Sequence, residues 1–165
     1  MHLVANSRTS FEPLRGVTDV RVRTGLCHLR LEGLGREDLM TRRLHALQCL
    51  RDAGVKIDFL KLTADGFACV VVEEDAAKAI EALAQGDGRV AESHGRALLS
   101  VHCVNIRDQV GIVAKIVEAA TAAGARIEQV GDSHDRILLV VEQEAGNKAA
   151  DALRAAFQLG ALNAD

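Results

Sequence analysis

The 165-residue chain contains no tryptophan, no tyrosine, one proline and only four phenylalanines. Without large aromatic side chains, its core must be built from Val, Ile, Leu and Ala in thin, closely packed layers. Sheets that bind RNA stack the bases on aromatic side chains of their strands. The composition therefore argues against an RNA-binding sheet.

Long apolar runs and blocks of like charge are also missing. No run reaches the roughly 18 residues that span a bilayer, and the N-terminus has no apolar stretch typical of a secretory signal. The formal net charge is −3, with acidic and basic residues mixed along the chain. Since phosphate contacts need clustered positive charge, we expect neither nucleic acid nor a membrane as partner, and we expect a cytoplasmic protein.

The sequence lacks the usual signatures of catalytic, cofactor and metal sites. Its four cysteines, Cys27, Cys49, Cys69 and Cys103, form no CxxC pair, and the six histidines are scattered. Zinc sites usually show closely spaced ligand pairs, so we expect reduced thiols and no metal. The glycine pairs lack the pattern of a dinucleotide or phosphate loop. We therefore predict no cofactor and no catalytic residue.

The chain does contain an internal repeat. Shifted by 70 residues, the segment that begins at Ala53 matches the segment that begins at Ala123 without a gap. Identical pairs include Gly54/Gly124, Ile57/Ile127, Asp65/Asp135, Val70/Val140, Val71/Val141, Lys78/Lys148 and Leu83/Leu153. Self-similarity at a fixed period indicates a duplicated structural unit.

Each copy is predicted to run strand, helix, strand, strand, helix. The ranges in the first copy are 28–34, 39–52, a hairpin over 57–73 and 76–83, with a closing strand over 90–94. Those in the second copy are 98–104, 112–120, 127–130, 136–142 and 147–157, with Asp108 placed to cap the first helix. The second copy lacks an obvious closing strand beyond 159–162. A strand over 17–22 has no counterpart in the repeat, so it could complete either sheet by strand exchange.

This order predicts an α+β fold made of two ferredoxin-like βαββαβ repeats, with antiparallel sheets and both helices of each repeat on one face. We expect an N-terminal linker over 1–16, a first domain over 17–95 and a second domain over 96–165.

The loop over 105–111 is the strongest candidate for a ligand site. It precedes a helix, whose unpaired N–H groups and dipole favour a carboxylate, and Gly111 removes a side chain where a ligand would approach. Glu128 and Gln129 lie on the adjacent predicted strand, where a carboxylate could pair with an ammonium group. Together these groups would suit a free amino acid. A capped helix with a solvated acid is the alternative.

The order and spacing of several segments resemble a known family. The stretch LLSVHCVNIRDQVGIVAKIVEAATAAGARIEQVGDSHDRILLVV is similar to the second ACT domain of aspartokinases, and AGVKID, from Ala53 to Asp58, is similar to the corresponding segment of the first. The likeness covers about 11–159. It implies a pair of ACT domains that resembles the regulatory region or the separate regulatory subunit of an aspartokinase.

The resemblance also implies a function in amino-acid biosynthesis. In that family, pairs of ACT domains bind lysine or threonine and inhibit the kinase allosterically, and two pairs form a dimer. It implies a non-catalytic chain without a kinase portion, an amino-acid effector, a homodimer and an aspartokinase catalytic chain as partner. The effector-binding residues implied by position or adjacency are Ile57, Asp58, Asp108, Gln109, Val110, Gly111, Ile112, Ile127, Glu128, Gln129 and Ser133.

Two positions depart from the family pattern. Val110 replaces the proline of the loop, and Thr41 stands where the first copy would have glycine. A β-branched residue at that position opposes a close approach of the backbone. The alternative interpretation is therefore a free-standing ACT-type dimerisation or sensor protein, with another partner or without a ligand.

Overall fold

The computed structural model describes residues 16–160, so nearly all of the predicted linker and the end of the 159–162 segment lie outside the described residues. The main elements are β1 (Gly16–Glu32), α1 (Leu39–Asp52), β2 (Phe59–Leu62), β3 (Phe67–Val72), α2 (Ala76–Leu83), β4 (Arg89–Val104), α3 (Ile112–Ala122), β5 (Ile127–Asp132), β6 (Arg136–Glu142) and α4 (Gln143–Ala156). Two short 3₁₀ helices, η1 (Glu73–Asp75) and η2 (Ile106–Asp108), complete the order. The α+β class is confirmed, and α1, α2 and β6 have the predicted bounds.

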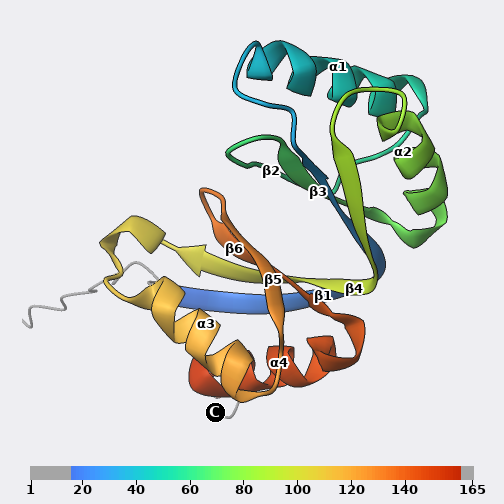
Figure 1. The fold of residues 1–165 in the computed structure, drawn as a ribbon. Coiled ribbons are helices and arrows are strands. Elements are labelled where there is room, and N and C mark those ends of the chain that lie inside the picture. The colour runs from blue at the N-terminus through green and yellow to red at the C-terminus, as the bar shows by residue number, and fades with distance from the viewer. Residues whose placement is uncertain (1–15, 161–165) are drawn as a thin grey trace, which may run out of the picture.

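The two expected sheets are joined into one six-stranded antiparallel sheet with the order β2-β3-β1-β4-β6-β5. β1 and β4 run through both halves and bend at Gly25 and Gly95, whose positive φ angles of 69° and 61° suit glycine. The bend divides the molecule into an upper unit with α1 and α2 and a lower unit with α3 and α4 (Figure 1).

Strand exchange within the chain completes the lower unit. The first half of β1 pairs with the second half of β4, as in Val20 opposite Val101. The lower unit thus takes its fourth strand from the start of the described chain, whereas the upper unit uses the second half of β1 and the first half of β4. The strand predicted over 17–22 is confirmed, and its place is in the lower half of the sheet.

The helices cover the outer faces of the bent sheet. One core lies between α1, α2 and the upper half of the sheet and includes Leu29, Leu50 and Phe67. A second lies between α3, α4 and the lower half and includes Leu99 and Ile116. The helix-free faces turn toward each other, and a small third core joins them near the bend, made of Leu26, Phe59, Val70, Leu98 and Val140.

The start of α3 differs from the prediction. Asp108 was expected to cap this helix, but it belongs to η2, and the N-cap residue of α3 is Gly111 with φ 79°. Because Asn105 also has a positive φ of 56°, the chain turns twice before α3 begins. No helix within residues 16–160 is long and apolar enough to cross a membrane.

Candidate functional site

The segment between β4 and α3, 105–111, forms an exposed loop at one end of the lower unit. It contains η2 and ends at Gly111, where a left-handed conformation lets the backbone enter α3. Val110 is fully exposed at its tip, while Ile112 is buried and anchors the first turn of α3 in the core. The loop is therefore held at its helix end and open at its tip.

A cavity of about 310 Å³ lies against this loop. It is lined by Gly16, Val17, Gln109, Val110, Gly111, Ile112, Lys115 and Phe157. The Lys115 ammonium lies 4.6 Å from the centre of the Phe157 ring. The start of α3 places the positive end of the helix dipole beside this cation, and both favour a carboxylate.

A second cavity, of about 270 Å³, lies on another side of the loop. Ile106, Asp132, Ser133 and His134 line it. Ser133 is a predicted site residue, and its neighbour Asp132 brings a carboxylate. The structure therefore places the loop between one cavity with a cation and another with an acid.

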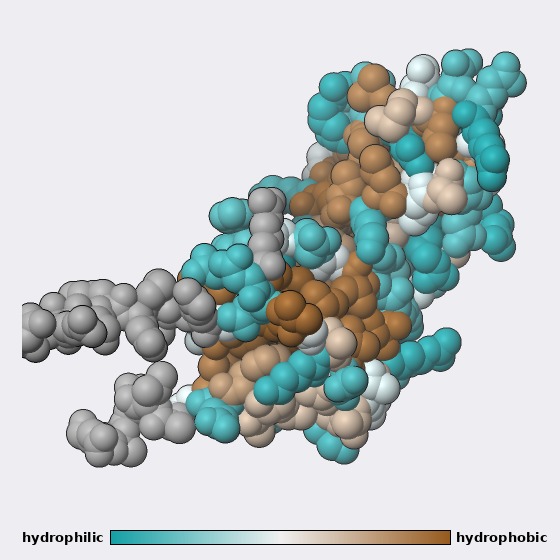
Figure 2. All heavy atoms as spheres, turned by 90° about the vertical axis from the view of Figure 1, so that its left-hand side faces the viewer, coloured by the Kyte–Doolittle hydropathy of each residue, from teal (hydrophilic) through white to brown (hydrophobic). Residues whose placement is uncertain are grey.

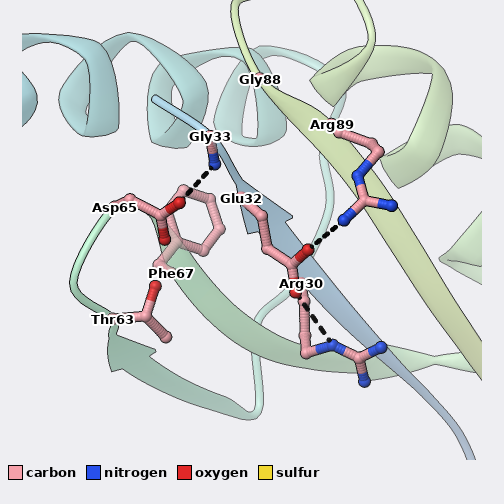
Figure 3. A pocket seen from close by; sticks show the side chains of 8 residues that line it. All are labelled: Arg30, Glu32, Gly33, Thr63, Asp65, Phe67, Gly88 and Arg89. Atoms are coloured by element: carbon pink, nitrogen blue, oxygen red, sulfur yellow. Dashed lines mark hydrogen bonds and ion pairs between the residues drawn. The ribbon is translucent and has the colours of Figure 1, made fainter. Parts of the chain in front are cut away.

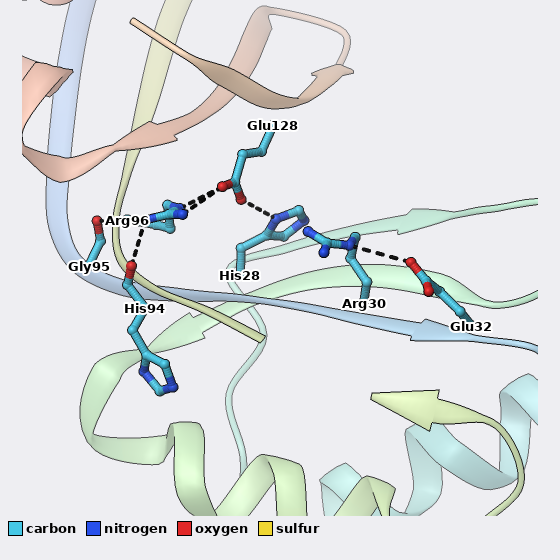
Figure 4. Close-up of polar contacts among 7 residues, drawn as sticks. All are labelled: His28, Arg30, Glu32, His94, Gly95, Arg96 and Glu128. Carbon is cyan, nitrogen blue, oxygen red and sulfur yellow. Dashed lines mark hydrogen bonds and ion pairs between the residues drawn. The ribbon is translucent and has the colours of Figure 1, made fainter. Parts of the chain in front are cut away.

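Glu128 lies elsewhere, between the two units near the bend (Figure 4). Its Oε1 accepts hydrogen bonds from Nε and Nη2 of Arg96 at 2.9 and 2.7 Å, and its Oε2 is 3.0 Å from Nδ1 of His28. Burial raises the pKa of Glu128, but the hydrogen bonds from Arg96 and His28 outweigh it and hold this pKa below the usual value. Glu128 is therefore ionised at neutral pH and already has two protein partners.

His28 is the most deeply buried member of this cluster, with no exposed surface. Burial lowers its pKa, although the hydrogen bond to Glu128 acts in the opposite direction. Its Nε2 has no partner among the described residues. The neutral imidazole and the Arg96–Glu128 ion pair thus connect β1, β4 and β5 across the bend.

Asp58, the repeat counterpart of Glu128, also has a protein partner near the bend. Its Oδ1 accepts a hydrogen bond of 2.5 Å from Arg23. On β2, Lys61 donates from Nζ to the carbonyl oxygen of Val130 at 2.5 Å, which links β2 to β5. Both predicted ammonium-binding acids therefore belong to the contact between the units.

The remaining predicted residues do not form a single site. Ile57 packs against the upper core and Ile127 against the lower one. Gln129 is half-buried on β5, and Asp108 is exposed in η2. The structure brings Gln109, Val110, Gly111 and Ile112 together around the first cavity. It separates them from Glu128 by about half of β4, because Arg96, the partner of Glu128, and Val104 are eight residues apart, or about 26 Å at the usual strand rise.

A further cavity, of about 380 Å³, lies in the upper unit (Figure 3). Glu32 lies between two arginines there, 2.7 Å from Nη2 of Arg89 and 3.5 Å from Nε of Arg30. Asp65 accepts a hydrogen bond of 2.9 Å from the backbone N–H of Gly33. An incoming carboxylate would compete with Glu32 for the arginines, so this cavity is a weaker candidate than the one beside α3.

The cysteines have the properties expected of structural thiols. All four are free, with Cys49 half-buried and the others buried. Burial raises the pKa of Cys27 and Cys103 to about 11 and that of Cys69 to about 12. Because the thiolate is the nucleophilic form, none of these three is an activated nucleophile at neutral pH.

Sequence reasoning missed four residues that line the cavity beside α3. Gly16 and Val17 come from the first half of β1, Lys115 from the second turn of α3, and Phe157 from the residue after α4. The unmatched strand over 17–22 was the one available signal, since it showed that an extra segment had to join one of the sheets.

Comparisons with known proteins agree with this fold. Residues 93–155 match the family model of the ACT domain. The lower unit therefore carries an ACT domain. No curated protein matches the chain.

Solved structures similar to this chain include aspartokinase regulatory subunits. The ligand-free regulatory subunit of aspartate kinase from Thermus thermophilus has 25% identity and a TM-score of 0.74 over 87% of this chain and 99% of that one. The subunit from Thermus flavus has 23% identity and a TM-score of 0.75 over the same shares. Escherichia coli aspartokinase III in complex with lysine and aspartate has 15% identity and a TM-score of 0.69, over 87% of this chain and 34% of that one. The ACT domain thus lies in a fold that resembles the regulatory module of aspartokinases.

Proposed function

We propose that this protein is a regulatory module that senses an amino acid and acts on an aspartokinase-type catalytic chain. The observation that carries the proposal is the likeness to the Thermus thermophilus regulatory subunit, which extends over 99% of that chain. On this proposal the module has no catalytic activity of its own, and it works in the cytoplasm.

The proposal treats both units as ACT domains. The family model matches residues 93–155 in the lower unit. The upper unit has the same strand order, with β2-β3-β1-β4 corresponding to β5-β6-β4-β1. The 70-residue repeat supports a common origin of the two units.

The proposed effector site is the cavity beside α3. The carboxylate of an amino acid would bind at the start of α3 and near Lys115, where the helix dipole and the ammonium group both favour negative charge. Asp108 is exposed next to Gln109 and would take the effector's ammonium group. Lysine and threonine are the first effectors to test, and lysine is present in the related Escherichia coli aspartokinase III structure.

Exposed apolar residues on the upper unit support a homodimer. Met40 and Leu44 of α1 are 61% and 54% exposed, and Leu60 and Leu62 of β2 are 41% and 48% exposed. Leu60 is opposite Cys69 and Leu62 opposite Phe67, and both partners lie in the core under α1 and α2. Leu60 and Leu62 therefore face the same side as α1.

This α1–β2 surface ends at an open sheet edge, because β2 is the terminal strand of the sheet. Open edges with apolar side chains favour pairing with another chain. Seen from the left of Figure 1, hydrophobic residues are exposed on both units, with hydrophilic residues among them (Figure 2). We propose that a second copy of this chain covers the α1–β2 surface.

In this mechanism the effector binds one arrangement of the two units better than the other and shifts their populations. A coupling of about 1–3 kcal/mol is typical of such systems. The bend at Gly25 and Gly95 is where the arrangement would change.

The first test is a thermal-shift screen of the full chain against the twenty amino acids. A ligand at about a hundredfold its dissociation constant adds roughly 2.7 kcal/mol to the free energy of unfolding, so a selective rise in melting temperature is expected. If none of the twenty raises it even at millimolar concentration, the amino-acid-sensing proposal fails.

Matched variants then locate the site. Lys115→Met should weaken binding of the amino acid found in the screen by about 10-fold or more, since an ion pair of about 1.4 kcal/mol is lost. His45→Gln alters the repeat counterpart of Lys115 on α1 and should leave the affinity unchanged. Equal effects of the two substitutions would contradict a site beside α3.

The kinase partner is tested by adding the purified chain to an aspartokinase catalytic chain. We expect the amino acid to inhibit phosphorylation of aspartate only when this chain is present.

The dimer is tested by measuring the molar mass of Leu60→Lys by light scattering. If this variant keeps the mass of the wild-type protein, pairing through the α1–β2 surface is contradicted.

A ligand-free dimerisation module is the second candidate function. One observation favours this function for the upper unit. Its helix α1 begins at Leu39, so the first turn of α1 takes the place that the end of the ligand-site loop takes in the lower unit. A dimer that no amino acid stabilises would support this alternative.

A further inference from the structure

Three side chains that are far apart in the sequence meet at the bend of the sheet. Cys27 lies on β1, Glu73 begins η1, and His94 lies on β4 directly before Gly95. The Sγ of Cys27, a carboxylate oxygen of Glu73 and a ring nitrogen of His94 all lie within 4.8 Å of one another. A buried thiol, an acid and an imidazole thus converge on one point.

Backbone and side-chain contacts around these groups already hold two of them in place. Nδ1 of His94 is hydrogen-bonded to Oε1 of Glu73, and the other oxygen, Oε2, accepts a hydrogen bond of 3.3 Å from the backbone N–H of Gly95. On the far side of the ring, Nε2 of His94 is 3.6 Å from a carboxylate oxygen of Glu92. Figure 4 shows His94 on the opposite side of the sheet from Glu128.

This arrangement has the chemistry of a zinc site. Thiolate, imidazole and carboxylate are the three protein ligands of zinc. A histidine that binds a metal usually donates its other N–H to a carboxylate, and carboxylate ligands are themselves hydrogen-bonded. Here Glu92 would be the carboxylate partner of His94, and the N–H of Gly95 is the hydrogen-bond donor to Glu73. Once the thiol is deprotonated, the charges of Cys27 and Glu73 match those of a divalent cation.

The distances require only a small rearrangement. In a tetrahedral site with metal–ligand bonds of about 2.0–2.3 Å, the ligand atoms lie about 3.5 Å apart. The hydrogen-bonded atoms of His94 and Glu73 would have to move apart, and the Sγ of Cys27, which lies within 4.8 Å of both, would have to come closer. The side chains of His94 and Glu73 are 50% and 38% exposed, so both have room to adjust.

We propose that Cys27, Glu73 and His94 bind a zinc ion, with a fourth position open to water. Glu92 orients the imidazole of His94 and is a positioning residue. The ion would join β1, β4 and η1 at the bend, beside Gly25 and Gly95, and so fix the angle between the two units. This site is independent of the proposed effector cavity, which lies at the other end of the lower unit.

No local pattern of residues predicts this site. The ligands are separated by 46 and 21 residues, whereas zinc motifs are recognised by close pairs. Only the antiparallel pairing of β1 with β4 brings Cys27 next to His94, because His28 is opposite Ser93.

The test uses the purified full chain after treatment with a chelator. Cobalt(II) is added first, since its bond to a thiolate gives an intense near-ultraviolet absorption band that imidazole and carboxylate do not produce. Zinc(II) affinity is then measured by competition with a chromogenic chelator. We expect one ion per chain, the cobalt–thiolate band, and a rise in melting temperature with zinc.

Variants separate this site from incidental binding. Loss of a residue that only orients a metal ligand lowers metal affinity by about 10- to 100-fold, so Glu92→Gln should lower the zinc affinity by an amount in this range. His94→Gln removes a ligand itself and should lower the zinc affinity by more than about 100-fold. Both side chains are about half exposed, so these variants should fold. Cys27→Ser should abolish the cobalt–thiolate band, whereas Cys49→Ser, which changes the half-buried thiol of α1, should leave band and affinity unchanged.

Two results would overturn the proposal. One is the absence of zinc binding at micromolar concentration by the folded wild-type chain. The other is an affinity that is equal in the wild-type protein and in His94→Gln, because the ion would then bind elsewhere.

Discussion

The helices α1 and α3 follow the first strand of their units, yet they begin differently. They end at repeat-equivalent residues, Asp52 and Ala122, but α1 has 14 residues and α3 has 11. Thr41 therefore lies in the first turn of α1, whereas its counterpart Gly111 precedes α3. Thr41 was expected to oppose a close approach of the backbone at the site, and in the structure it lies inside α1, within the range predicted for this helix.

The residues that follow show what this extra turn does. Arg43 is buried and donates from Nε to the carbonyl oxygen of Gly66 at 2.8 Å and from Nη2 to that of Thr63. Its counterpart, Val113, is 40% exposed. The upper unit thus uses the start of α1 to hold the β2–β3 turn, while the lower unit leaves the start of α3 open beside a cavity. In the two copies of the repeat, the start of α1 is therefore bound to the β2–β3 turn, whereas the start of α3 is accessible.

Removing the buried arginine should have the largest effect on this difference. Arg43→Ala takes the charged donor from the buried carbonyl group of Gly66 and the partly buried one of Thr63, so we expect the free energy of unfolding to fall by about 2–4 kcal/mol. Val113→Ala removes an exposed side chain and should change it by less than about 0.5 kcal/mol. Denaturant unfolding followed by circular dichroism compares the two. Equal losses would show that both helix starts contribute equally to stability.

The acids at the contact between the units should differ in the same measurement. Glu128→Gln breaks a cluster with two well-buried partners and should cost about 1–3 kcal/mol. Asp58→Asn affects an ion pair whose arginine is 52% exposed, and should cost at most about 1 kcal/mol. A larger loss for Asp58→Asn would contradict the assignment of Glu128 as the main polar link.

The pH dependence of stability should identify the same cluster. The pKa of Glu128 and that of His28 are both lowered in the folded protein, so the unfolded chain binds more protons than the folded one as the solution is acidified. This stabilisation is complete above the ordinary values of 6.5 for His28 and 4.5 for Glu128, and it declines as the pH falls through the lowered values. In unfolding measured from pH 7.5 to 5, above the ordinary titration range of Glu128, Glu128→Gln should show a steeper decline than the wild-type protein, because without this carboxylate the pKa of His28 falls further.

The two left-handed residues at the helix starts should give the smallest difference. Gly111→Ala places a side chain at φ 79° and should cost about 1 kcal/mol. Asp38 at the start of α1 has φ 50° without being glycine. Asp38→Gly removes the backbone strain of this conformation but increases the conformational entropy of the unfolded chain. We therefore expect the free energy of unfolding, from the same denaturant curves, to change by no more than about 0.5 kcal/mol. A large stabilisation by Asp38→Gly would mean that this position is strained.

Most of the fold could be predicted from the residues alone. The parallel with the second copy located α1 and α2 to the residue, and the apolar run over 136–142 located β6. The start of α4 was missed by four residues, since Gln143–Gly146 carries no helix signal apart from Glu144 and Ala145. The loop at 105–111 was predicted as a candidate site, and the structure places a cavity beside it.

The partners of the predicted acids could not be predicted. Glu128 and Asp58 were expected to bind an ammonium group, and the structure pairs them with Arg96 and Arg23. These pairs depend on the bend of β1 and β4, which turns the helix-free faces of the two units toward each other. No local pattern in the sequence specifies the angle of such a bend.

The sequence by itself determined the repeat, the order of the elements and the two helix-covered cores, because these depend on the spacing of apolar side chains along short stretches of chain. The tertiary structure alone decided which strand completes the lower unit, which charges meet between the units, and that Cys27, Glu73 and His94 converge. Those outcomes depend on the pairing of β1 with β4, whose paired residues are 57 to 88 positions apart. Contacts at that separation are fixed by how the whole sheet closes and bends.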